Sequence, residues 1–572
     1  MRLKILAFLF ALAFLAVSGR LFYWQVVRGD DLSQAASYQH NDTREVVAPR
    51  GDIYASDGSW LAVMRQNWLV FAELPKLTEN KEKVAEKLSS ILAEKDDNNE
   101  VYKQNILDLT DQIYSSLTRK EVVWVPLKHK VTSQQKSQIE KLAIEGIGFE
   151  PEDSRFYPEA SSSAQLLGFV GKDDDGLDTG YFGLEGYYDI ALSGKPGFLL
   201  RQKDVRGAQI VGQGVSEISS SAGADLVTHI DKRIQLTLEE NLQAGLEKYG
   251  AKQVSGIIMD PKTGAVLAMG SYPSFDPKKY FDYSDELFKN PIISDVYEPG
   301  SVFKIMVMAA GLDSGAVDID TKCDICGEPL KVDKYYIKTW NNEYTADSTM
   351  TDVIVHSDNV GMSFVAQKLG ADLLYDYLDK FGIGHISGVD LQGEVTSQMR
   401  EKGTWNIVDL ATTSFGQGIS TTSMQIITAV AAIANKGVMM QPQVVDKVKI
   451  EGWGEDIKPK EIRRVISTQA ASKMTTMMEE AANNGEAQWT NLPGFGVAGK
   501  TGTAQIPIAG HYDEEKTIAS FVGFAPSTDP KFVMLITLRE PQSSPWASET
   551  AAPLWYSVAR DLFTYFGIQP EN

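Results

Sequence analysis

Cysteine is nearly absent from this chain: only Cys323 and Cys326 occur among 572 residues. A zinc site with four thiolate ligands needs a second pair of cysteines, so we expect no metal site here. Thioredoxin-like redox chemistry needs a βαβ context, which the surrounding sequence does not provide. We therefore interpret the pair as a small loop disulfide, which requires an exported protein.

Nucleotide-binding signals are also missing. The sequence has no dinucleotide-binding fingerprint, no P-loop in a suitable context and no basic stripe, so we expect no cofactor. The net charge of −21 would repel phosphates and argues against a nucleic-acid partner. With 43% hydrophobic and 23% charged residues, the balance is that of a globular protein. A length of 572 residues suggests two to four domains.

Long apolar runs are scarce too, and residues 5–27 form the only one. A membrane-spanning helix needs about 20 mostly apolar residues, so this run suffices. Arg2 and Lys4 precede it, which predicts a single-pass anchor over residues 1–28 with its N-terminus in the cytoplasm and the rest outside. A cleaved signal peptide is the alternative, because Ala16–Ser18 resembles a cleavage site.

The part that follows the apolar run, residues 29–225, is mixed and irregular in pattern. Apolar residues recur at helical spacing within 78–120, a strand is predicted at 121–125 and a helix at 134–142. The Ser/Gly-rich run 219–223 predicts a boundary, which we place at residue 225.

Beyond this boundary, residues 226–572 are more regular and form the second large domain. We predict a long amphipathic helix at 230–249, followed by strands at 255–259 and 265–271. A further strand, interrupted by glycines, is predicted at 496–506. The expected fold class is α+β and multidomain: a membrane helix, an irregular mixed α/β pedestal, and a C-terminal domain with an antiparallel sheet flanked by helices.

Three short motifs in this second domain carry the chemistry. They are Ser301-Val-Phe-Lys304, Ser357-Asp-Asn359 and Lys500-Thr-Gly-Thr503. Each is weak alone, but this order is typical of the active site of penicillin-recognising serine acyltransferases. A second Lys-Thr-Gly at Lys262–Gly264 precedes the serine, and its proline and glycine context predicts a turn instead.

The first motif predicts a nucleophile and its base. Pro299 and Gly300 place Ser301 at the start of an apolar helix that we expect to end near Gly311. Lys304 follows one turn later on the same face, where its amine can take the hydroxyl proton. It must be neutral to do so, and burial beside a second cation would depress its pKa.

The other two motifs supply substrate contacts. Ser357 is predicted to relay a proton to the leaving group, and Asn359 to hold a substrate amide. Lys500 is the second cation, and Lys500 with the Thr501 and Thr503 hydroxyls suits a substrate carboxylate. Gly502 in a strand indicates close approach by another backbone, which we interpret as a peptide substrate laid alongside. The backbone N–H groups of Ser301 and Thr503 are candidates for the oxyanion hole.

With these motifs the chain resembles a class B penicillin-binding protein, a monofunctional peptidoglycan D,D-transpeptidase, over nearly its whole length. The membrane-proximal motifs that resemble this family are Pro49–Ile53 with Gly58 and Leu61–Ala62, Arg155–Pro158, Leu167–Gly171, and Gly183–Gly186 with Leu192–Gly194. The catalytic stretches Asp295–Lys304, Ser414–Ile419 and Val497–Gln505 are similar to septal, cell-division members. The chain departs from the family at Ala55–Asp57 and in its Cys-x-x-Cys.

The resemblance implies the roles given above and a single-pass membrane enzyme that cross-links stem peptides ending in D-Ala-D-Ala and binds β-lactams. Because no glycosyltransferase region precedes the pedestal, we expect a membrane-embedded glycan polymerase and other division proteins as partners. Three alternatives stay open: a D,D-carboxypeptidase or β-lactam hydrolase, a non-catalytic division scaffold or penicillin receptor, and an elongation-type transpeptidase. A β-lactamase is disfavoured because no Glu-x-x-Leu-Asn stretch follows Ser357.

Overall fold

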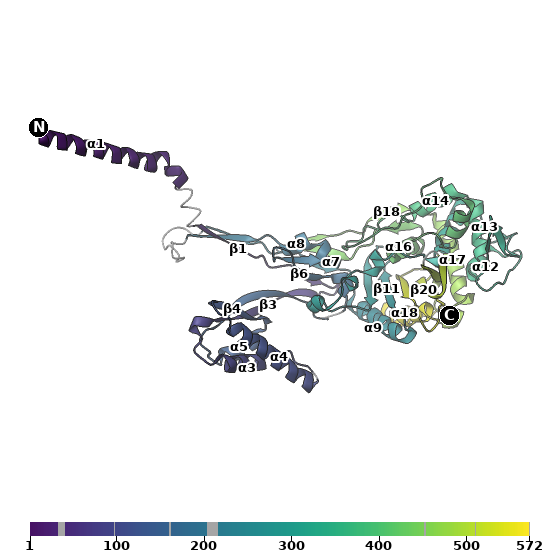
Figure 1. Ribbon diagram of the computed structural model, residues 1–572. Coiled ribbons are helices and arrows are strands. Elements are labelled where there is room, and N and C mark those ends of the chain that lie inside the picture. The colour runs from purple at the N-terminus through teal and green to yellow at the C-terminus, as the bar shows by residue number, and fades with distance from the viewer. Residues whose placement is uncertain are drawn as a thin grey trace. The chain divides into compact units, whose positions relative to one another are not determined.

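The structure, a computed structural model, divides into two compact units (Figure 1). One comprises Met1–Gly51 and Ser193–Ala224, and the other Asp52–Leu192 and Asp225–Asn572. The described residues are 1–32, 41–96, 98–159, 162–202, 216–450, 453–508 and 511–570.

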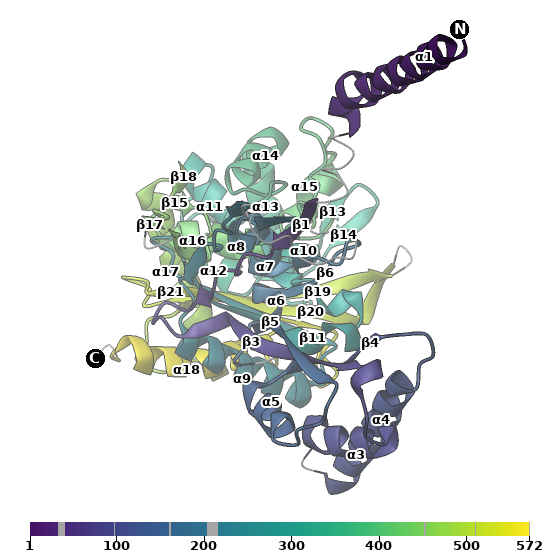
Figure 2. The same cartoon turned by 90° about the vertical axis from the view of Figure 1, so that its left-hand side faces the viewer.

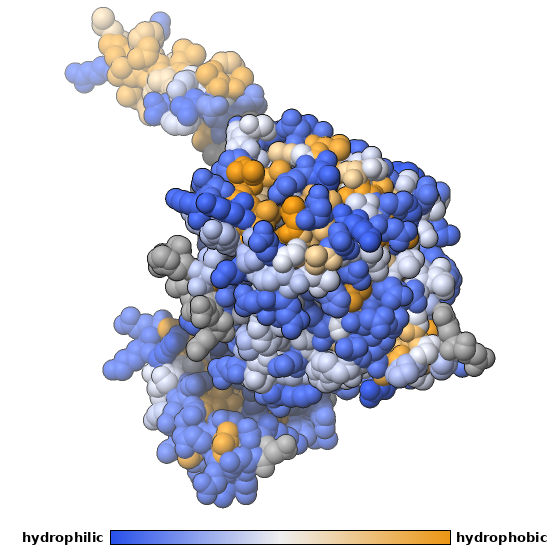
Figure 3. All heavy atoms as spheres, turned by 90° about the vertical axis from the view of Figure 1, so that its right-hand side faces the viewer, coloured by the Kyte–Doolittle hydropathy of each residue, from blue (hydrophilic) through white to orange (hydrophobic). Residues whose placement is uncertain are grey.

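The first unit contains the apolar helix. Helix α1 (Arg2–Phe22) continues as a short π-helical turn, η1 (Tyr23–Val27). Together they are long and apolar enough to cross a membrane, and Figure 3 shows the helix as a nearly continuous hydrophobic surface. The same unit holds an antiparallel three-stranded sheet in the order β1-β8-β9. Its strands are β1 (Asn41–Val46), β8 (Gly197–Gln202) and β9 (Ser216–Ile218).

One part of the second unit is built on a single sheet. Its strand order is β17-β16-β10-β2-β3-β4, with β5 also paired to β3. The strands are β2 (Ile53–Tyr54), β3 (Trp60–Glu73), β4 (Trp124–Val131), β5 (Ile147–Phe156), β10 (Asp225–Thr228), β16 (Val445–Ile450) and β17 (Trp453–Asp456). Helices α3 (Lys81–Leu92), α4 (Asn99–Leu117) and α5 (Ser133–Glu140) pack on it around a small apolar core of their own.

A buried ion pair joins strand β5 of this sheet to helix α7 (Gly183–Tyr187). Arg155 on β5 and Glu185 on α7 lie 2.6 Å apart, with side chains 3% and 0% exposed. Such a pair holds its segments in register, because losing one partner would leave a buried charge uncompensated. The neighbouring elements are α6 (Ala164–Leu167), β6 (Phe169–Lys172), β7 (Asp178–Tyr181) and α8 (Asp189–Ser193).

The catalytic part is an antiparallel five-stranded sheet in the order β12-β11-β21-β20-β19. Its strands are β11 (Gln253–Met259), β12 (Val266–Tyr272), β19 (Ala498–Ile508), β20 (His511–Ala525) and β21 (Phe532–Arg539). Helices α9 (Lys232–Tyr249) and α18 (Ala551–Phe566) cover one face, and α10 (Pro291–Ser294) and α16 (Ser423–Ala434) the other (Figure 2). Strand β19 ends this order, so among the described residues no strand pairs with its outer edge, which can accept a further strand.

The remaining elements complete the second unit. They are η3 (Pro277–Asp282), η4 (Asp285–Leu287), η5 (Gly300–Phe303), α11 (Lys304–Ser314), β13 (Leu330–Val332), β14 (Tyr335–Ile337), α12 (Met350–Val355), α13 (Asn359–Leu369), α14 (Ala371–Lys380), α15 (Ile407–Thr413), β15 (Val438–Met440), β18 (Glu461–Arg464), α17 (Thr468–Asn484) and η6 (Gln488–Thr490).

The predicted α+β multidomain class is confirmed, as are the long helix at α9 and the hairpin strands β11 and β12. One helix end was predicted wrongly: α11 runs to Ser314 instead of stopping near Gly311. A Cβ on Gly311 would lie 2.9 Å from both Val317 and Val365, so this glycine is there for packing. Gly315 (φ +73°) is the left-handed cap. The domain boundaries at residues 28 and 225 stay predictions.

Candidate active site

Ser301 lies in a tight turn at the start of a buried helix. The 3₁₀ turn η5 carries it and leads directly into α11, whose first residue is Lys304. Gly300 adopts φ +58°, and a Cβ there would lie 3.0 Å from the Thr503 carbonyl oxygen. Glycine is therefore needed where the serine turn approaches the backbone of β19, and that approach brings the Ser301 and Thr503 backbones together.

Lys304 is fully buried and held by the second motif. Its Nζ donates to the Ser357 carbonyl oxygen (2.5 Å), to Ser357 Oγ (3.2 Å) and to Asn359 Oδ1 (2.7 Å). Burial and the nearby charge of Lys500 lower the pKa of Lys304 to about 7, against the opposing influence of Glu486 and Asp358. At neutral pH a large fraction of this amine is therefore unprotonated, as a general base requires.

The backbone at the second motif is shaped for this contact. Ser357 has φ +56°, which is unusual for a residue with a side chain. This conformation joins α12 to α13 and lets both the carbonyl and the hydroxyl of Ser357 face Lys304. Asp358 caps α13 by accepting from the Val360 N–H, and Asn359 Nδ2 donates to the Lys338 carbonyl oxygen (2.9 Å). The Asn359 amide is thus fixed in orientation between Lys304 and the preceding loop.

The third motif supplies a second buried lysine with a carboxylate behind it. Lys500 is 3% exposed, and its Nζ donates to Thr501 Oγ1 (3.1 Å). Thr501 Oγ1 in turn donates to Glu486 Oε2 (2.9 Å). Burial lowers the pKa of Lys500, while Glu486 works against that change. Lys500, Thr501 and Glu486 therefore form a chain of polar groups, and the charges of Lys500 and Glu486 act on Lys304.

The glycine in this strand has close neighbours within the protein, and its contact with a substrate stays a prediction. A Cβ on Gly502 would lie 2.8 Å from Val302 and 3.1 Å from the Pro299 carbonyl oxygen. Gly502 therefore allows β19 to pack against the serine turn, and the close backbone is part of the protein. Thr503 Oγ1 accepts from the Ala547 N–H (3.0 Å), which ties the strand to the loop before α18.

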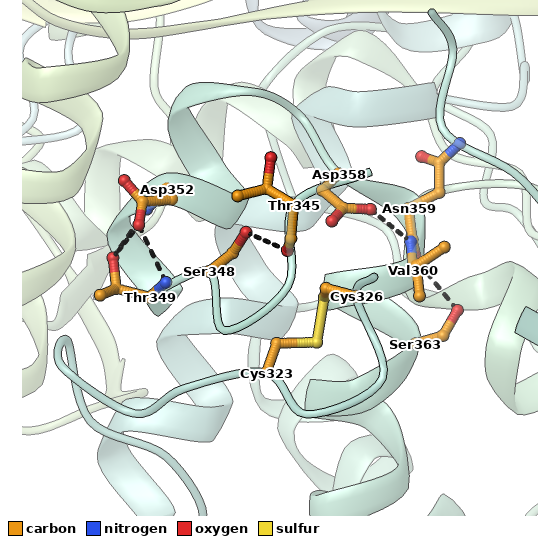
Figure 4. The surroundings of a disulfide bond; sticks show 10 residues. All are labelled: Cys323, Cys326, Thr345, Ser348, Thr349, Asp352, Asp358, Asn359, Val360 and Ser363. Carbon is orange, nitrogen blue, oxygen red and sulfur yellow. Dashed lines mark hydrogen bonds between the residues drawn. A yellow bond between two sulfur atoms is a disulfide. The ribbon is translucent and has the colours of Figure 1, made fainter. Parts of the chain in front are cut away.

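The two cysteines form the predicted disulfide in the loop before the second motif (Figure 4). Both are fully buried, and the Cys323 N–H donates to the Ser348 carbonyl oxygen (2.9 Å). The disulfide therefore anchors the start of the segment whose Lys338 carbonyl oxygen holds Asn359.

Replacing both Cys323 and Cys326 by alanine should loosen this segment. The closed loop is short, so chain entropy predicts a loss of about 2 kcal/mol of local stability. We expect faster amide hydrogen exchange across residues 322–349, with α9 unchanged as the internal reference. Equal protection in the variant and the wild type would show that packing alone holds the loop.

Sequence reasoning missed Glu486, which lies between α17 and β19. It is the carboxylate that offsets the charge of both buried lysines. A lone glutamate gives no sequence signal, although two predicted buried cations imply that some carboxylate must lie nearby. Trp340 and Trp546 were missed as well; their rings are 5.4 Å apart. Trp340 Nε1 donates to the His356 carbonyl oxygen, beside the second motif.

Glu486→Gln should move the pH profile of acylation. The amide can still accept from Thr501, but it removes the charge that raises the pKa of Lys304 and Lys500. Both lysines then lose their protons at lower pH. The rate of penicillin acylation should rise with pH as Lys304 loses its proton and fall again as Lys500 loses its own, and both changes shift to lower pH in this variant. Glu480→Gln, an exposed residue on α17, is the control and should leave the profile in place. An unmoved profile in Glu486→Gln would exclude this electrostatic role.

Two family models match the chain. Residues 254–563 match the penicillin-binding protein transpeptidase domain, and residues 45–228 match the penicillin-binding protein dimerisation domain. The first of these covers more than half of the chain and contains all three motifs.

Named relatives agree with these matches over almost the whole chain. The chain is 30% identical to the peptidoglycan D,D-transpeptidase FtsI homolog of Mesostigma viride, covering 96% of this chain and 94% of that protein. It is 28% identical to stage V sporulation protein D of Bacillus subtilis, covering 98% and 85%. It is also 28% identical to peptidoglycan D,D-transpeptidase FtsI of Escherichia coli, covering 98% and 91%.

Solved structures show the same architecture. Penicillin-binding protein 3 of Mycobacterium tuberculosis, complexed with aztreonam, superposes with a TM-score of 0.69 at 25% identity, covering 92% of this chain and 98% of that one. Penicillin-binding protein 2X of Streptococcus thermophilus has a TM-score of 0.74 at 24% identity, covering 92% and 80%. With its apolar N-terminal helix, dimerisation domain and serine-type transpeptidase domain, the chain belongs to the class B penicillin-binding proteins.

Proposed function

We propose that this chain is a peptidoglycan D,D-transpeptidase of the septal type, acting through an acyl-enzyme on Ser301. The observation that carries the proposal is the buried amine of Lys304, with a pKa of about 7, one turn after a serine and held by Ser357 and Asn359. Burying a lysine amine disfavours its charged form, and a strongly lowered pKa in a site of this kind is typical of a catalytic base.

In the first half-reaction, Ser301 Oγ attacks the carbonyl carbon of the penultimate D-Ala while Lys304 takes the hydroxyl proton. The oxyanion accepts hydrogen bonds from the Ser301 and Thr503 N–H groups. Ser357 passes a proton to the departing nitrogen, and the terminal D-Ala leaves as the free amino acid. Lys500, with Thr501, Gly502 and Thr503, binds the carboxylate of that terminal residue, and Asn359 holds the amide of the donor peptide.

In the second half-reaction, the amine of a neighbouring stem attacks the ester. Its nitrogen loses a proton as the new peptide bond forms, and Ser301 regains its hydrogen. Water competes with the amine for the same ester, so some carboxypeptidase activity accompanies transfer. β-Lactams enter at the same serine, because their amide is opened by the same attack.

The N-terminal helix supports a proposal for the location of the chain. We propose that α1 and η1 anchor the chain with its N-terminus in the cytoplasm, since Arg2 and Lys4 precede the apolar run. The catalytic part then works outside the membrane on strands made by a membrane-embedded glycan polymerase, together with other division proteins. The names of the two transpeptidase relatives above support the division branch.

The test is to incubate the purified chain with a fluorescent penicillin, then with a peptide ending in D-Ala-D-Ala and an amine acceptor. A stable label, followed by release of D-Ala and an amide-linked product, supports the transpeptidase. Rapid loss of the label with no amide product would assign a hydrolase. A folded chain that takes no label would overturn the enzyme reading in favour of a scaffold.

A further inference from the structure

A cavity of about 330 Å³ lies beside the serine turn, on the face of the catalytic sheet that α10 and α16 cover. Its lining includes Asp295 and Glu298, which precede Ser301 in the chain. From the sheet it includes Gln505 and Pro507 on β19 and Thr537 and Arg539 on β21. The mechanism proposed above uses none of these side chains, although both Glu298 and Gln505 are within three residues of a group that it does use.

The charges in this cavity do not balance. Among the described residues that line it, Arg539 is the one cation. One Arg539 guanidinium nitrogen lies 3.8 Å from Asp295 and another lies 3.9 Å from Glu540. Glu298 accepts from the Gly418 N–H (3.0 Å) and from the Tyr512 hydroxyl (3.2 Å). Among the described residues, no lysine, arginine or histidine forms an ion pair with Glu298. Burial raises the pKa of the Glu298 carboxyl, against the opposing influence of its hydrogen bonds to Gly418 and Tyr512.

The Glu298 carboxylate has room for a further hydrogen-bond donor. Among the described residues it accepts from the Gly418 N–H and the Tyr512 hydroxyl, whereas an ionised carboxylate has about four acceptor sites. An ammonium group, with three donors and a positive charge, suits the free acceptor sites of Glu298.

The position of the cavity identifies which part of the substrate can reach it. With the terminal carboxylate at Lys500 and Thr501 and the attacked carbonyl at Thr503, the donor peptide lies antiparallel to β19 along its open edge. Each residue advances about 3.3 Å, so the residue before the attacked D-Ala lies near Ala504 and Gln505. Its side chain is therefore next to the cavity.

The proposed reaction supplies a cationic group for this place. The acceptor is an amine on a neighbouring stem, and donor stems of the same kind carry that amine too. We infer that the cavity binds the side-chain ammonium of the diamino acid that precedes D-Ala-D-Ala in the donor stem, with Glu298 as its counterion. This inference rests on the proposed function and adds a specificity-determining residue to it.

The test compares two peptides on the full-length protein in the absence of an acceptor amine. They are Nα-acetyl-L-lysyl-D-alanyl-D-alanine and the same peptide with norleucine in place of lysine, which has nearly the same length without the charge. D-Ala release, as kcat/KM, should be at least about tenfold faster for the lysine peptide, the usual discrimination for a hydrogen bond to a charged group. Equal rates for the two peptides on the wild type would overturn the inference without any variant.

Glu298→Gln keeps the acceptor for Gly418 and Tyr512 but removes the charge, so the ratio of the two rates should fall to about one. The ratio is internal and does not depend on how fast the variant is overall. Glu549→Gln, an exposed carboxylate in the loop before α18, is the matched control and should keep the preference. A preference that survives in Glu298→Gln would overturn the role of this residue.

Two further outcomes separate the inference from the proposed function. If the wild type takes no fluorescent penicillin and releases D-Ala from neither peptide, the proposed function itself fails. If the donor peptides are used equally but Glu298→Gln changes the ratio of aminolysis to hydrolysis, the ammonium belongs to the acceptor, and the donor assignment is overturned.

Discussion

Ser301→Ala is expected to abolish covalent labelling by fluorescent penicillin and D-Ala release together. The substitution removes the oxygen that forms the ester, and removing the nucleophile of a serine acyl-enzyme costs on the order of 10⁶-fold in rate. No other hydroxyl of the motifs can replace it, because Ser357 is already engaged by Lys304 and Thr501 by Glu486. The measurement is in-gel fluorescence, with the mass of the intact protein as a second readout.

The control for this variant is Ser314→Ala, at the exposed end of the same helix, α11. It should label at the wild-type rate. The thermal melting of Ser301→Ala should match that of the wild type, since only one oxygen atom is lost. Residual covalent label in Ser301→Ala, on a protein that melts normally, would place the nucleophile elsewhere.

The order of the three motifs allowed most of the site to be predicted from the sequence. Lys304, Ser357 and Asn359 are in hydrogen-bond contact, and the serine turn packs on β19. Such motifs are readable because a helix turn fixes the distance between a serine and a lysine three residues later. The disulfide was also predictable, because Cys323 and Cys326 are the only two cysteines in the sequence and lie three residues apart.

What could not be predicted depends on packing between distant segments. Glu486 is one of 76 acidic residues, and its role arises only once β19 is placed against α17 and the serine turn η5. Gly502 was predicted to admit a close substrate backbone, and within the protein the space beside it is taken by Val302, Ser520 and the Pro299 carbonyl oxygen. A glycine within a strand pattern indicates that another group approaches closely, but only the folded structure identifies that group.

Glu298 is a residue whose position was evident from the sequence but whose surroundings were not. Its position before Pro299 and Ser301 was visible in the sequence as part of a family-like stretch. Its lack of a cation partner among the described residues, and the cavity that it lines, depend on α10, α16 and four sheet strands, β11, β19, β20 and β21. A buried carboxylate indicates a cationic ligand when no neighbouring cation of the protein neutralises its charge.

Lys304→Arg is the second variant with a very large expected effect. A free lysine with a pKa near 10.5 would be unprotonated only about 3 times in 10⁴ at pH 7, whereas a pKa of about 7 leaves about half of the amine neutral. The environment of Lys304 therefore supplies roughly a 10³-fold gain in active base. Arginine cannot lose its proton in this range, so penicillin acylation at pH 7 should fall by about 10³-fold or more. Lys368→Arg, an exposed lysine on α13, should acylate normally.

The pH profile of the wild type provides the independent check. Only neutral Lys304 can accept the Ser301 proton, so the rate constant for penicillin acylation should fall tenfold per pH unit below about 7 and level off above it. Lys500 acts in the opposite sense, because it must keep its charge to bind a carboxylate. Since burial lowers the pKa of Lys500 below its usual 10.5, the rate should fall again on an alkaline limb below that pH. A rate that stays flat from pH 5 to pH 9 would mean that no lysine with a lowered pKa takes part in acylation.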